Sequence, residues 1–231
     1  MRTIGLIGGM SWESTAEYYR IINESVKERL GGLHSAKIVM YSVDFAEIER
    51  LQHEEKWDKA ISLMIDAAKR VESANADFVL ICTNTMHKMA GDVAASISIP
   101  LLHIADVTAE KITSQGLKEV GLLGTKFTME QDFYKGRLKE KFGIRVLIPN
   151  ESEREVVHNV IYKELCLGKV KDSSRERVKT IINRLSDNGA QGIILGCTEL
   201  PLLIKQKDYP VPLFDTTVIH AKAAVNYALK D

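Results

Sequence analysis

The stretch DFVLICTNTMH, which spans residues 77–87, decides how this chain folds. A short apolar run ends on Cys82, and small polar residues follow it at once. Such a run is typical of a buried strand that ends in a turn. The stretch GIILGCTEL, which spans residues 192–200, has the same design and carries Cys197 at the end of its apolar run. Together the two stretches predict two cysteines at equivalent strand-to-turn junctions.

Strand-like and helix-like segments alternate outward from these two stretches. In the first half we expect strands at 3–7, 37–43, 77–81 and 99–102, and helices at about 14–30, 46–54, 57–75 and 86–96. In the second half we expect strands at 119–123, 145–148, 192–195 and 211–214, and helices at about 106–115, 129–142, 152–167, 173–188 and 216–229. This alternation favours an α/β fold of mainly parallel sheets flanked by helices.

The two halves of the chain also match each other weakly. IGLIG at 4–8 matches VGLLG at 120–124, Cys82-Thr83 matches Cys197-Thr198, and IPLL at 99–102 matches VPLF at 211–214. Matches in the same order at similar offsets indicate two pseudo-symmetric lobes rather than a short repeat. We expect lobe 1 to comprise residues 1–103 and 209–231, and lobe 2 residues 104–208. Because ligands of open α/β sheets bind beyond the carboxyl ends of the strands, we expect the active site in the cleft between the lobes.

Composition argues against several classes of protein. Lys+Arg and Asp+Glu both total 31, so no basic excess favours a nucleic-acid or membrane surface. The apolar runs are shorter than the roughly 20 residues that a membrane helix needs. Residues 4–10 lack a signal-peptide cleavage pattern, so we expect a strand there. Three cysteines do not make a disulfide framework, and we expect a reduced, cytoplasmic protein.

A pair of thiols in this setting could carry acid–base chemistry. Cap-type residues follow both of them, namely Thr83, Asn84, Thr85 and Thr198. Exposed N–H groups at a helix N-terminus would lower a thiol pKa and could bind a carboxylate. One thiolate could then remove a proton from carbon while the other thiol protonates the opposite face. Each cysteine could instead be a small apolar core residue, which is the interpretation we give to Cys166 within its expected helix.

The sequence shows no fingerprint of a common cofactor. Residues 5–9 do not form G-x-G-x-x-G, no P-loop motif is present, and the cysteines lack C-x-x-C spacing. No lysine sits where it would argue for a pyridoxal phosphate Schiff base. We therefore expect neither a cofactor nor a metal.

The motifs resemble those of the aspartate/glutamate racemase family. Gly8-Gly9-Met10, Cys82-Thr83-Asn84-Thr85 with His87, and Gly196-Cys197-Thr198-Glu199 carry the resemblance, which covers essentially the whole chain. GGMSWEST, GGLHSA, CTNTMHK, TMEQDFY and KELCLG look especially like the enterobacterial members. The resemblance implies a cofactor-independent racemase of aspartate and/or glutamate, commonly a homodimer. It also implies that Cys82 and Cys197 are the two acid/base residues.

The resemblance further implies a set of substrate-binding residues: Met10, Gln52, Thr83, Asn84, Thr85, Thr125, Lys163, Thr198 and Glu199. Arg50 and His87 are additional candidates. Periodicity alone instead predicts a solvated side chain for Lys163, and composition does so for Arg50 and Gln52. Thr83 and Thr85 could be helix caps, Glu199 a first-turn acid, and His87 either a tuning group for Cys82 or a structural histidine.

Other functions stay open on the same residues. A related hydantoin racemase, or an isomerase or decarboxylase of dicarboxylates, would form different products, and a single essential thiol would favour the decarboxylase. A non-catalytic dicarboxylate-binding protein would bind aspartate without exchanging its α-proton. The sequence does not rank aspartate against glutamate, because one methylene in a pocket changes binding by only about 1–3 kcal/mol.

Overall fold

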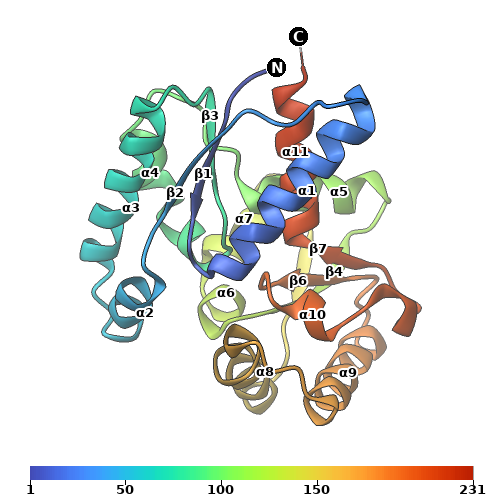
Figure 1. The fold of residues 1–231 in the computed structure, drawn as a ribbon. Coiled ribbons are helices and arrows are strands. Elements are labelled where there is room, and N and C mark those ends of the chain that lie inside the picture. Colours follow the sequence, from blue (N-terminus) through green and yellow to red (C-terminus); the bar gives the residue numbers. More distant parts are fainter. Residues whose placement is uncertain (231) are drawn as a thin grey trace. The chain divides into compact units, whose positions relative to one another are not determined.

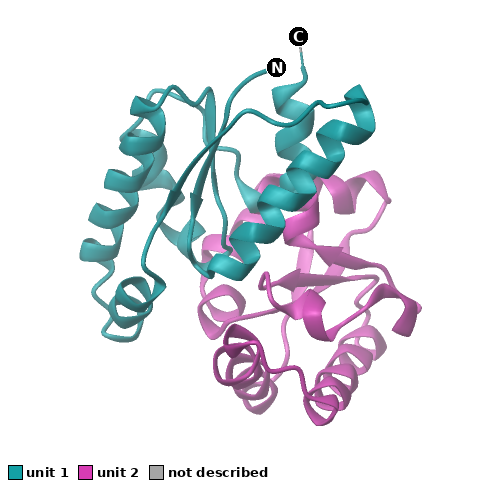
Figure 2. Ribbon diagram, in the orientation of Figure 1, with its two compact units in different colours: residues 1–104, 220–231 teal, residues 105–219 magenta. Residues whose placement is uncertain are grey.

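The structure is a computed structural model that describes residues 1–230, and it divides into two compact units (Figure 2). Unit 1 comprises Met1–Ile104 together with the segment that begins at His220, and unit 2 comprises Ala105–Ile219. Each unit contains its own parallel sheet flanked by helices (Figure 1). The predicted fold class is therefore confirmed.

Unit 1 is built on a three-stranded parallel sheet in the order β2-β1-β3. Its strands are β1 (Ile4–Gly8), β2 (Ile38–Ser42) and β3 (Phe78–Ile81). Its helices are α1 (Trp12–Leu30), α2 (Phe45–His53), α3 (Trp57–Ser73), the 3-10 helix η1 (Thr85–Met89) and α4 (Ala90–Ala95). Helix α11 (Thr216–Ala228) begins in unit 2 and continues into unit 1.

The apolar face of helix α3 explains how this helix packs against the sheet of unit 1. Its buried residues, Ala60, Met64, Ala67, Ala68 and Val71, recur every three or four positions and form one apolar face. That face packs with Ile7, Val79 and Ile81 of the strands into one core cluster. A methyl group at Gly5 would collide with Val71 and with the carbonyl of Phe78. Glycine at the middle strand therefore permits the close approach of helix to sheet.

Unit 2 is built on a four-stranded parallel sheet in the order β5-β4-β6-β7. Its strands are β4 (Glu119–Gly124), β5 (Arg145–Leu147), β6 (Ile193–Gly196) and β7 (Leu213–Asp215). Its α-helices are α5 (Ile104–Ser114), α6 (Lys126–Glu130), α7 (Asp132–Phe142), α8 (Glu151–Lys163), α9 (Asp172–Asp187) and α10 (Leu200–Leu203). Two short 3-10 helices are η2 (Leu165–Leu167) and η3 (Gln206–Asp208).

The two sheets share hydrogen bonds at corresponding places. The Val79 N–H donates to the Pro100 carbonyl, and the Ile193 N–H donates to the Pro212 carbonyl, each over 2.9 Å. The strand expected at 99–102 is nevertheless only a single bridge, between Val79 and Leu101, whereas its counterpart is β7. Because β7 pairs with β6, residues 209–219 lie in unit 2, although we expected them in lobe 1.

Three of the expected helices are shorter than predicted. The segment at 86–96 forms η1 followed by α4, and the segment at 129–142 is divided into α6 and α7 by an extended backbone at Gln131. Helix α8 ends at Lys163, which leaves Cys166 half-buried in the turn η2 rather than in mid-helix. None of the helices within residues 1–230 has the length and apolar content that a membrane-spanning helix needs.

His220 anchors α11 to the rest of unit 1. Its ring is fully buried, its Nε2–H donates to the Leu102 carbonyl over 2.8 Å, and its Nδ1 accepts from the Tyr18 hydroxyl over 2.9 Å. Burial first, and the neighbouring His87 second, lower the pKa of His220 to about 3. The folded protein therefore holds this imidazole in its neutral form.

We expect His220 to make the protein less stable in mild acid. In the unfolded chain this histidine takes up a proton below about pH 6.5, but in the folded protein it does so only near its lowered pKa. Its stabilising contribution is therefore complete above pH 6.5 and falls by up to about 1.4 kcal/mol per pH unit below it. Urea denaturation between pH 7 and pH 4 measures this slope.

The variant His220→Gln should flatten the slope, and His34→Gln, at an exposed position, should leave it unchanged. An unaltered slope in His220→Gln would show that other groups cause the acid sensitivity.

Candidate active site

Cys82 lies at the carboxyl edge of the sheet of unit 1. It directly follows β3, and its N–H donates to the Ile7 carbonyl over 2.9 Å, which continues the hydrogen-bond ladder between β1 and β3. The side chain is fully buried. The backbone of the thiol-bearing residue is thereby tied to the end of β1.

Cys197 lies at the corresponding edge of unit 2, but it is displaced by one residue. The ladder pairs Ile7 with Ile81 and would place Cys82 opposite Gly8, whereas the matching ladder places Gly196 opposite Gly124. Cys82 therefore corresponds to Gly196, and Cys197 is the residue after it. Successive side chains of a strand point to opposite faces, so the two thiols do not start from equivalent positions. The prediction of equivalent junctions is wrong in this respect.

Close packing explains why the thiol of unit 2 is carried by the later residue. A Cβ atom at Gly196 would come within 2.8 Å of a Leu122 methyl and 2.9 Å of the Leu123 carbonyl. These distances are too short for any side chain. The position that holds cysteine in unit 1 is therefore restricted to glycine in unit 2.

A buried carboxylate accepts hydrogen bonds from Cys197 and its neighbour. The Cys197 thiol donates to Glu199 Oε2 over 3.0 Å, and the Thr198 hydroxyl donates to the same oxygen over 2.9 Å. Glu199 is itself buried. This arrangement fixes the direction of the thiol proton and makes Glu199 a candidate acceptor for it.

Both thiols are held in their neutral forms. Burial raises the pKa of Cys82, and burial followed by the charge of Glu199 raises the pKa of Cys197. We expected lowered values from helix N-termini, and that expectation is wrong. The 3-10 helix η1 and the four-residue helix α10 have no side-chain cap, and such short helices provide little dipole to offset desolvation.

His87 holds the turn that follows Cys82. Its Nδ1–H donates to the Thr83 carbonyl over 2.7 Å, and its Nε2 accepts from the Ile104 N–H over 3.2 Å. Asn84, rather than Thr83 or Thr85, occupies the cap position of η1, so the interpretation of the threonines as caps is wrong. Asn84 and Thr85 are buried and Thr83 is partly buried.

Met10 and Gln52 lie in the same region of the core as the Cys82 turn. Met10 packs in the core with Ile81 and Met86. Gln52 is buried, and its Nε2 lies 3.0 Å from the Met86 sulfur. The expectation that Gln52 is a surface residue is therefore wrong, because this residue lies on the inner side of α2.

Arg50 and Lys163 are the two candidates that the structure leaves exposed. Arg50 lines a surface hollow of about 460 Å³ together with Glu47, Glu54 and Lys59, on the outer side of α2. Lys163 is the last residue of α8. Neither side chain shares the buried surroundings of the thiol in its own unit.

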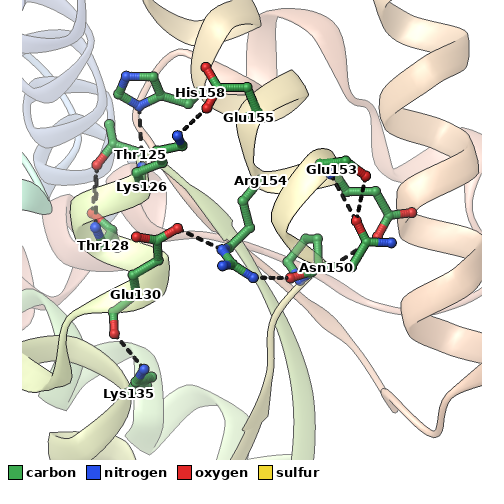
Figure 3. A network of polar contacts seen from close by, with 12 residues as sticks. Thr125, Lys126, Thr128, Glu130, Lys135, Asn150, Glu153, Arg154, Glu155 and His158 are labelled. Atoms are coloured by element: carbon green, nitrogen blue, oxygen red, sulfur yellow. Dashed lines mark hydrogen bonds and ion pairs between the residues drawn. The ribbon is translucent and has the colours of Figure 1, made fainter.

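Thr125 lies beside β6, at the end of β4, in a turn that polar contacts hold in place (Figure 3). Its Oγ1 accepts from the Thr128 N–H over 3.3 Å, which caps α6. The Lys126 N–H donates to His158 Nδ1 over 3.2 Å, and the Lys126 ammonium pairs with Glu155. Helix α8 thus fixes the turn that carries Thr125.

Further from the motifs, sequence reasoning missed the residues that support the Cys82 turn. His103 and His220 are buried against His87, and Tyr18 donates to His220. The only sequence signal for the two histidines is that each directly follows apolar residues, which is compatible with burial. Within residues 1–230, no group of three or more His, Cys, Asp or Glu side chains is arranged to hold a metal ion.

Replacing Glu199 by glutamine should make Cys197 easier to ionise. The variant Glu199→Gln keeps a hydrogen-bond acceptor but removes the negative charge that raises the pKa of Cys197. In a Cys82→Ala, Cys166→Ala background, the thiolate absorbance near 240 nm should titrate at lower pH once Glu199→Gln is added. Asp187→Asn, an exposed residue before the opposite end of β6, is the matched control. An unchanged midpoint would contradict the assigned role of Glu199.

Comparison with known proteins places this arrangement in one family. The profile of the Asp/Glu/hydantoin racemase family matches residues 7–224. A solved structure of a candidate Asp/Glu racemase from Yersinia pestis is 55% identical, with both chains fully covered and a TM-score of 0.94. An aspartate racemase homologue from Pyrococcus horikoshii OT3 is 37% identical, again over both full chains, with a TM-score of 0.87. The broad specificity amino-acid racemase RacX of Bacillus subtilis (strain 168) is 25% identical over 96% of each chain. The chain therefore belongs to the Asp/Glu/hydantoin racemase family.

Proposed function

We propose that this protein is a cofactor-independent racemase that interconverts the L and D forms of aspartate, glutamate or both. Cys82 and Cys197 are the two acid/base residues of this proposal. The observation that carries it is a buried thiol beyond the end of one strand in each unit, one of them hydrogen-bonded to a buried carboxylate. Membership of the racemase family supports the reaction class, and the aspartate racemase homologue supports the substrate.

The reaction is a transfer of one proton on each face of the same carbon. One cysteine, as thiolate, takes the proton from Cα, and the electron pair of the broken C–H bond stays on the substrate as a carbanion delocalised into its carboxyl group. The other cysteine, as thiol, donates its proton to the opposite face, which inverts the centre. The first cysteine ends as thiol and the second as thiolate, so the reverse reaction uses the same groups with their protonation states exchanged.

Burial of the thiols suits this chemistry. A raised pKa makes the thiolate a stronger base toward a weakly acidic C–H bond, although it lowers the fraction of thiolate at neutral pH. The negative charge of Glu199 adds to that cost at Cys197, while the 3.0 Å contact gives the Cys197 proton a defined acceptor. Exclusion of water limits protonation of the carbanion by solvent.

The substrate carboxylate and ammonium groups would bind to polar residues beside each thiol. These are Thr83, Asn84 and Thr85 in unit 1 and Thr125, Thr198 and Glu199 in unit 2, with Met10 as an apolar wall. Gln52 is a candidate for the side-chain carboxylate, and its burial next to Met86 supports a role near the Cys82 turn. Lys163 and Arg50 are proposed for the same carboxylate on the family resemblance alone.

The cysteines also bear on where the enzyme works. Cys82, Cys166 and Cys197 are all free thiols. Two of them are the proposed acid/base residues, and free thiols persist in a reducing compartment. We therefore propose a cytoplasmic enzyme.

Removal of either acid/base residue should abolish most of the inversion. Cys82→Ala and Cys197→Ala should each lower kcat for racemisation by about 10²–10⁴-fold, because a positioned acid or base contributes that much. Chiral chromatography of L- and D-aspartate incubated in D₂O measures inversion, and NMR of the same samples measures α-proton exchange. Cys166→Ala serves as the control and should retain full activity.

Undiminished racemisation in either cysteine variant would contradict the two-base scheme. Release of CO₂, or conversion of a hydantoin alone, would identify one of the related enzymes instead. Aspartate binding with no deuterium exchange in the wild-type protein would indicate a binding protein.

We also propose that the enzyme is a homodimer that associates through one apolar surface of unit 1. The exposed apolar side chains Trp12, Tyr19, Leu30, Leu33 and Met40 define this α1–β2 surface. Trp12 is 68% exposed and Tyr19 54%, which is unusual for side chains of their size. They recur along α1 at helical spacing, whereas the flank with Glu13, Glu17 and Glu24 is charged.

The edge strand β2 continues this surface. In the sheet order β2-β1-β3, this strand lies at the edge, and its sequence IVMYS contains no charge and no proline to protect that edge. The Ala36 N–H donates to Asn23 Oδ1 over 3.0 Å, which places the uncharged flank of α1 on the side of β2. A strand edge can pair antiparallel with its own copy about a two-fold axis, so a second copy of this chain fits the surface.

Charges placed on the α1–β2 surface should separate the dimer. The double variant Trp12→Glu, Met40→Glu should sediment as a monomer at about 10 µM, because burying unpaired like charges in an apolar interface is unfavourable. Val170→Glu replaces an exposed apolar residue of unit 2 and should remain dimeric. A dimer that persists in the double variant, or a wild-type protein that is monomeric at about 100 µM, would contradict the proposal.

A further inference from the structure

Three buried histidines surround the turn that follows Cys82. His87, His103 and His220 all belong to unit 1 and have at most 7% of their surface exposed. The His87 ring lies 4.6 Å from the His103 ring and 5.8 Å from the His220 ring, centroid to centroid. Such a cluster is costly to bury unless its members are neutral and hydrogen-bonded.

The hydrogen bonds of His87 assign its tautomer. Nδ1 must carry the proton, because it lies 2.7 Å from the Thr83 carbonyl, which can only accept. Nε2 must be unprotonated, because it faces the Ile104 N–H, which can only donate, over 3.2 Å. The neutral ring thus joins the turn after Cys82 to the first residue of α5.

The segment that receives His87 is itself held to the sheet and to two helices. The Leu102 N–H donates to the Val79 carbonyl over 2.9 Å, and the Leu102 carbonyl accepts from His220 Nε2 over 2.8 Å. His220 in turn accepts from Tyr18 of α1. His87 therefore connects the turn to residues 102–104, a segment that is hydrogen-bonded both to β3 and to His220.

Cys82 is consequently restrained on both sides of its Cα atom. Its own N–H is bonded to the Ile7 carbonyl, and the carbonyl of the following residue, Thr83, is bonded to His87. We propose that His87 is a positioning residue for Cys82, acting through the Thr83 carbonyl on that thiol alone. This inference rests on the proposed two-cysteine racemase. Cys197 is oriented instead by its hydrogen bond to Glu199.

In this role His87 affects the proton-transfer steps of Cys82 more than those of Cys197. Displacement of a catalytic group by about 1 Å can lower a rate by about 10²-fold. Loss of the Thr83 bond should therefore lower the rates of the steps in which Cys82 removes or delivers a proton. Proton removal by Cys197 should be affected less.

Two variants separate the two hydrogen bonds of His87. In His87→Asn, the amide nitrogen occupies the place of Nδ1 and keeps a donor for the Thr83 carbonyl. In His87→Gln, the longer amide reaches the place of Nε2, keeps an acceptor for the Ile104 N–H and loses the donor to Thr83. Both replacements are neutral and polar, so they differ mainly in which bond they preserve.

The test measures α-proton exchange in D₂O separately for L- and D-aspartate, with inversion and thermal melting measured alongside. His87→Gln should lower kcat for α-proton exchange by about 10²-fold. Its KM should rise as well, because the turn that moves also carries the proposed substrate-binding residues Thr83, Asn84 and Thr85. The ratio of its α-proton exchange rates on L- and D-aspartate should change in the same direction as in Cys82→Ala, and not as in Cys197→Ala. His87→Asn should stay within about tenfold of the wild type, and the exposed-site variant His34→Asn should match the wild type.

The inference would be overturned if His87→Gln lost α-proton exchange equally on L- and D-aspartate. It would also be overturned if His87→Asn were as impaired as His87→Gln. If both variants melt below the assay temperature, the exchange pattern is measured below their melting temperatures, where the same criteria apply. Failure of the racemase proposal itself is a separate result, since then the wild type would not racemise or the cysteine variants would remain active.

Discussion

Close packing of a glycine in an inner strand of each sheet, β1 in unit 1 and β4 in unit 2, is the constraint on which the rest of the structure depends. A side chain at Gly5 would collide with Val71 of α3, and one at Gly121 would come within 2.6 Å of Ile193 and 3.0 Å of Leu185 of α9. Because these glycines have no side chain, a helix can pack closely against the sheet and the adjacent strand can pack without a steric clash. The thiol-bearing turns start at the ends of those neighbouring strands, β3 and β6, so their burial follows from the same packing.

Burial brings chemical advantages and a cost to the same groups. Desolvation favours the uncharged thiol and so raises the pKa of both Cys82 and Cys197. A thiolate formed in such surroundings is a strong base, but it is rarely populated. The two thiols have different neighbours, since a carboxylate accepts a hydrogen bond from Cys197 whereas a neutral histidine holds the turn after Cys82.

The internal duplication is therefore imperfect where the chemistry is concerned. Corresponding hydrogen bonds reach Pro100 in one sheet and Pro212 in the other, so the sheets keep a common plan. At the strand ends, however, Gly196 takes the place that Cys82 has, and the second thiol moves one residue along. The proposed racemisation of two mirror-image substrates does not require identical halves. It needs only one proton-transfer group for each face of the substrate carbon.

The sequence by itself determined the alternation of strands and helices, the parallel sheets and the positions of Cys82 and Cys197 after apolar runs. These follow from periodicity and from turn residues, which are local properties. Only the tertiary structure decided the one-residue offset of the thiols, the burial of Gln52, the pairing of β7 with β6 and the direction of the thiol pKa values. Strand register, burial and desolvation depend on residues far apart in the chain, such as the paired Gly124 and Gly196, and no local pattern records them.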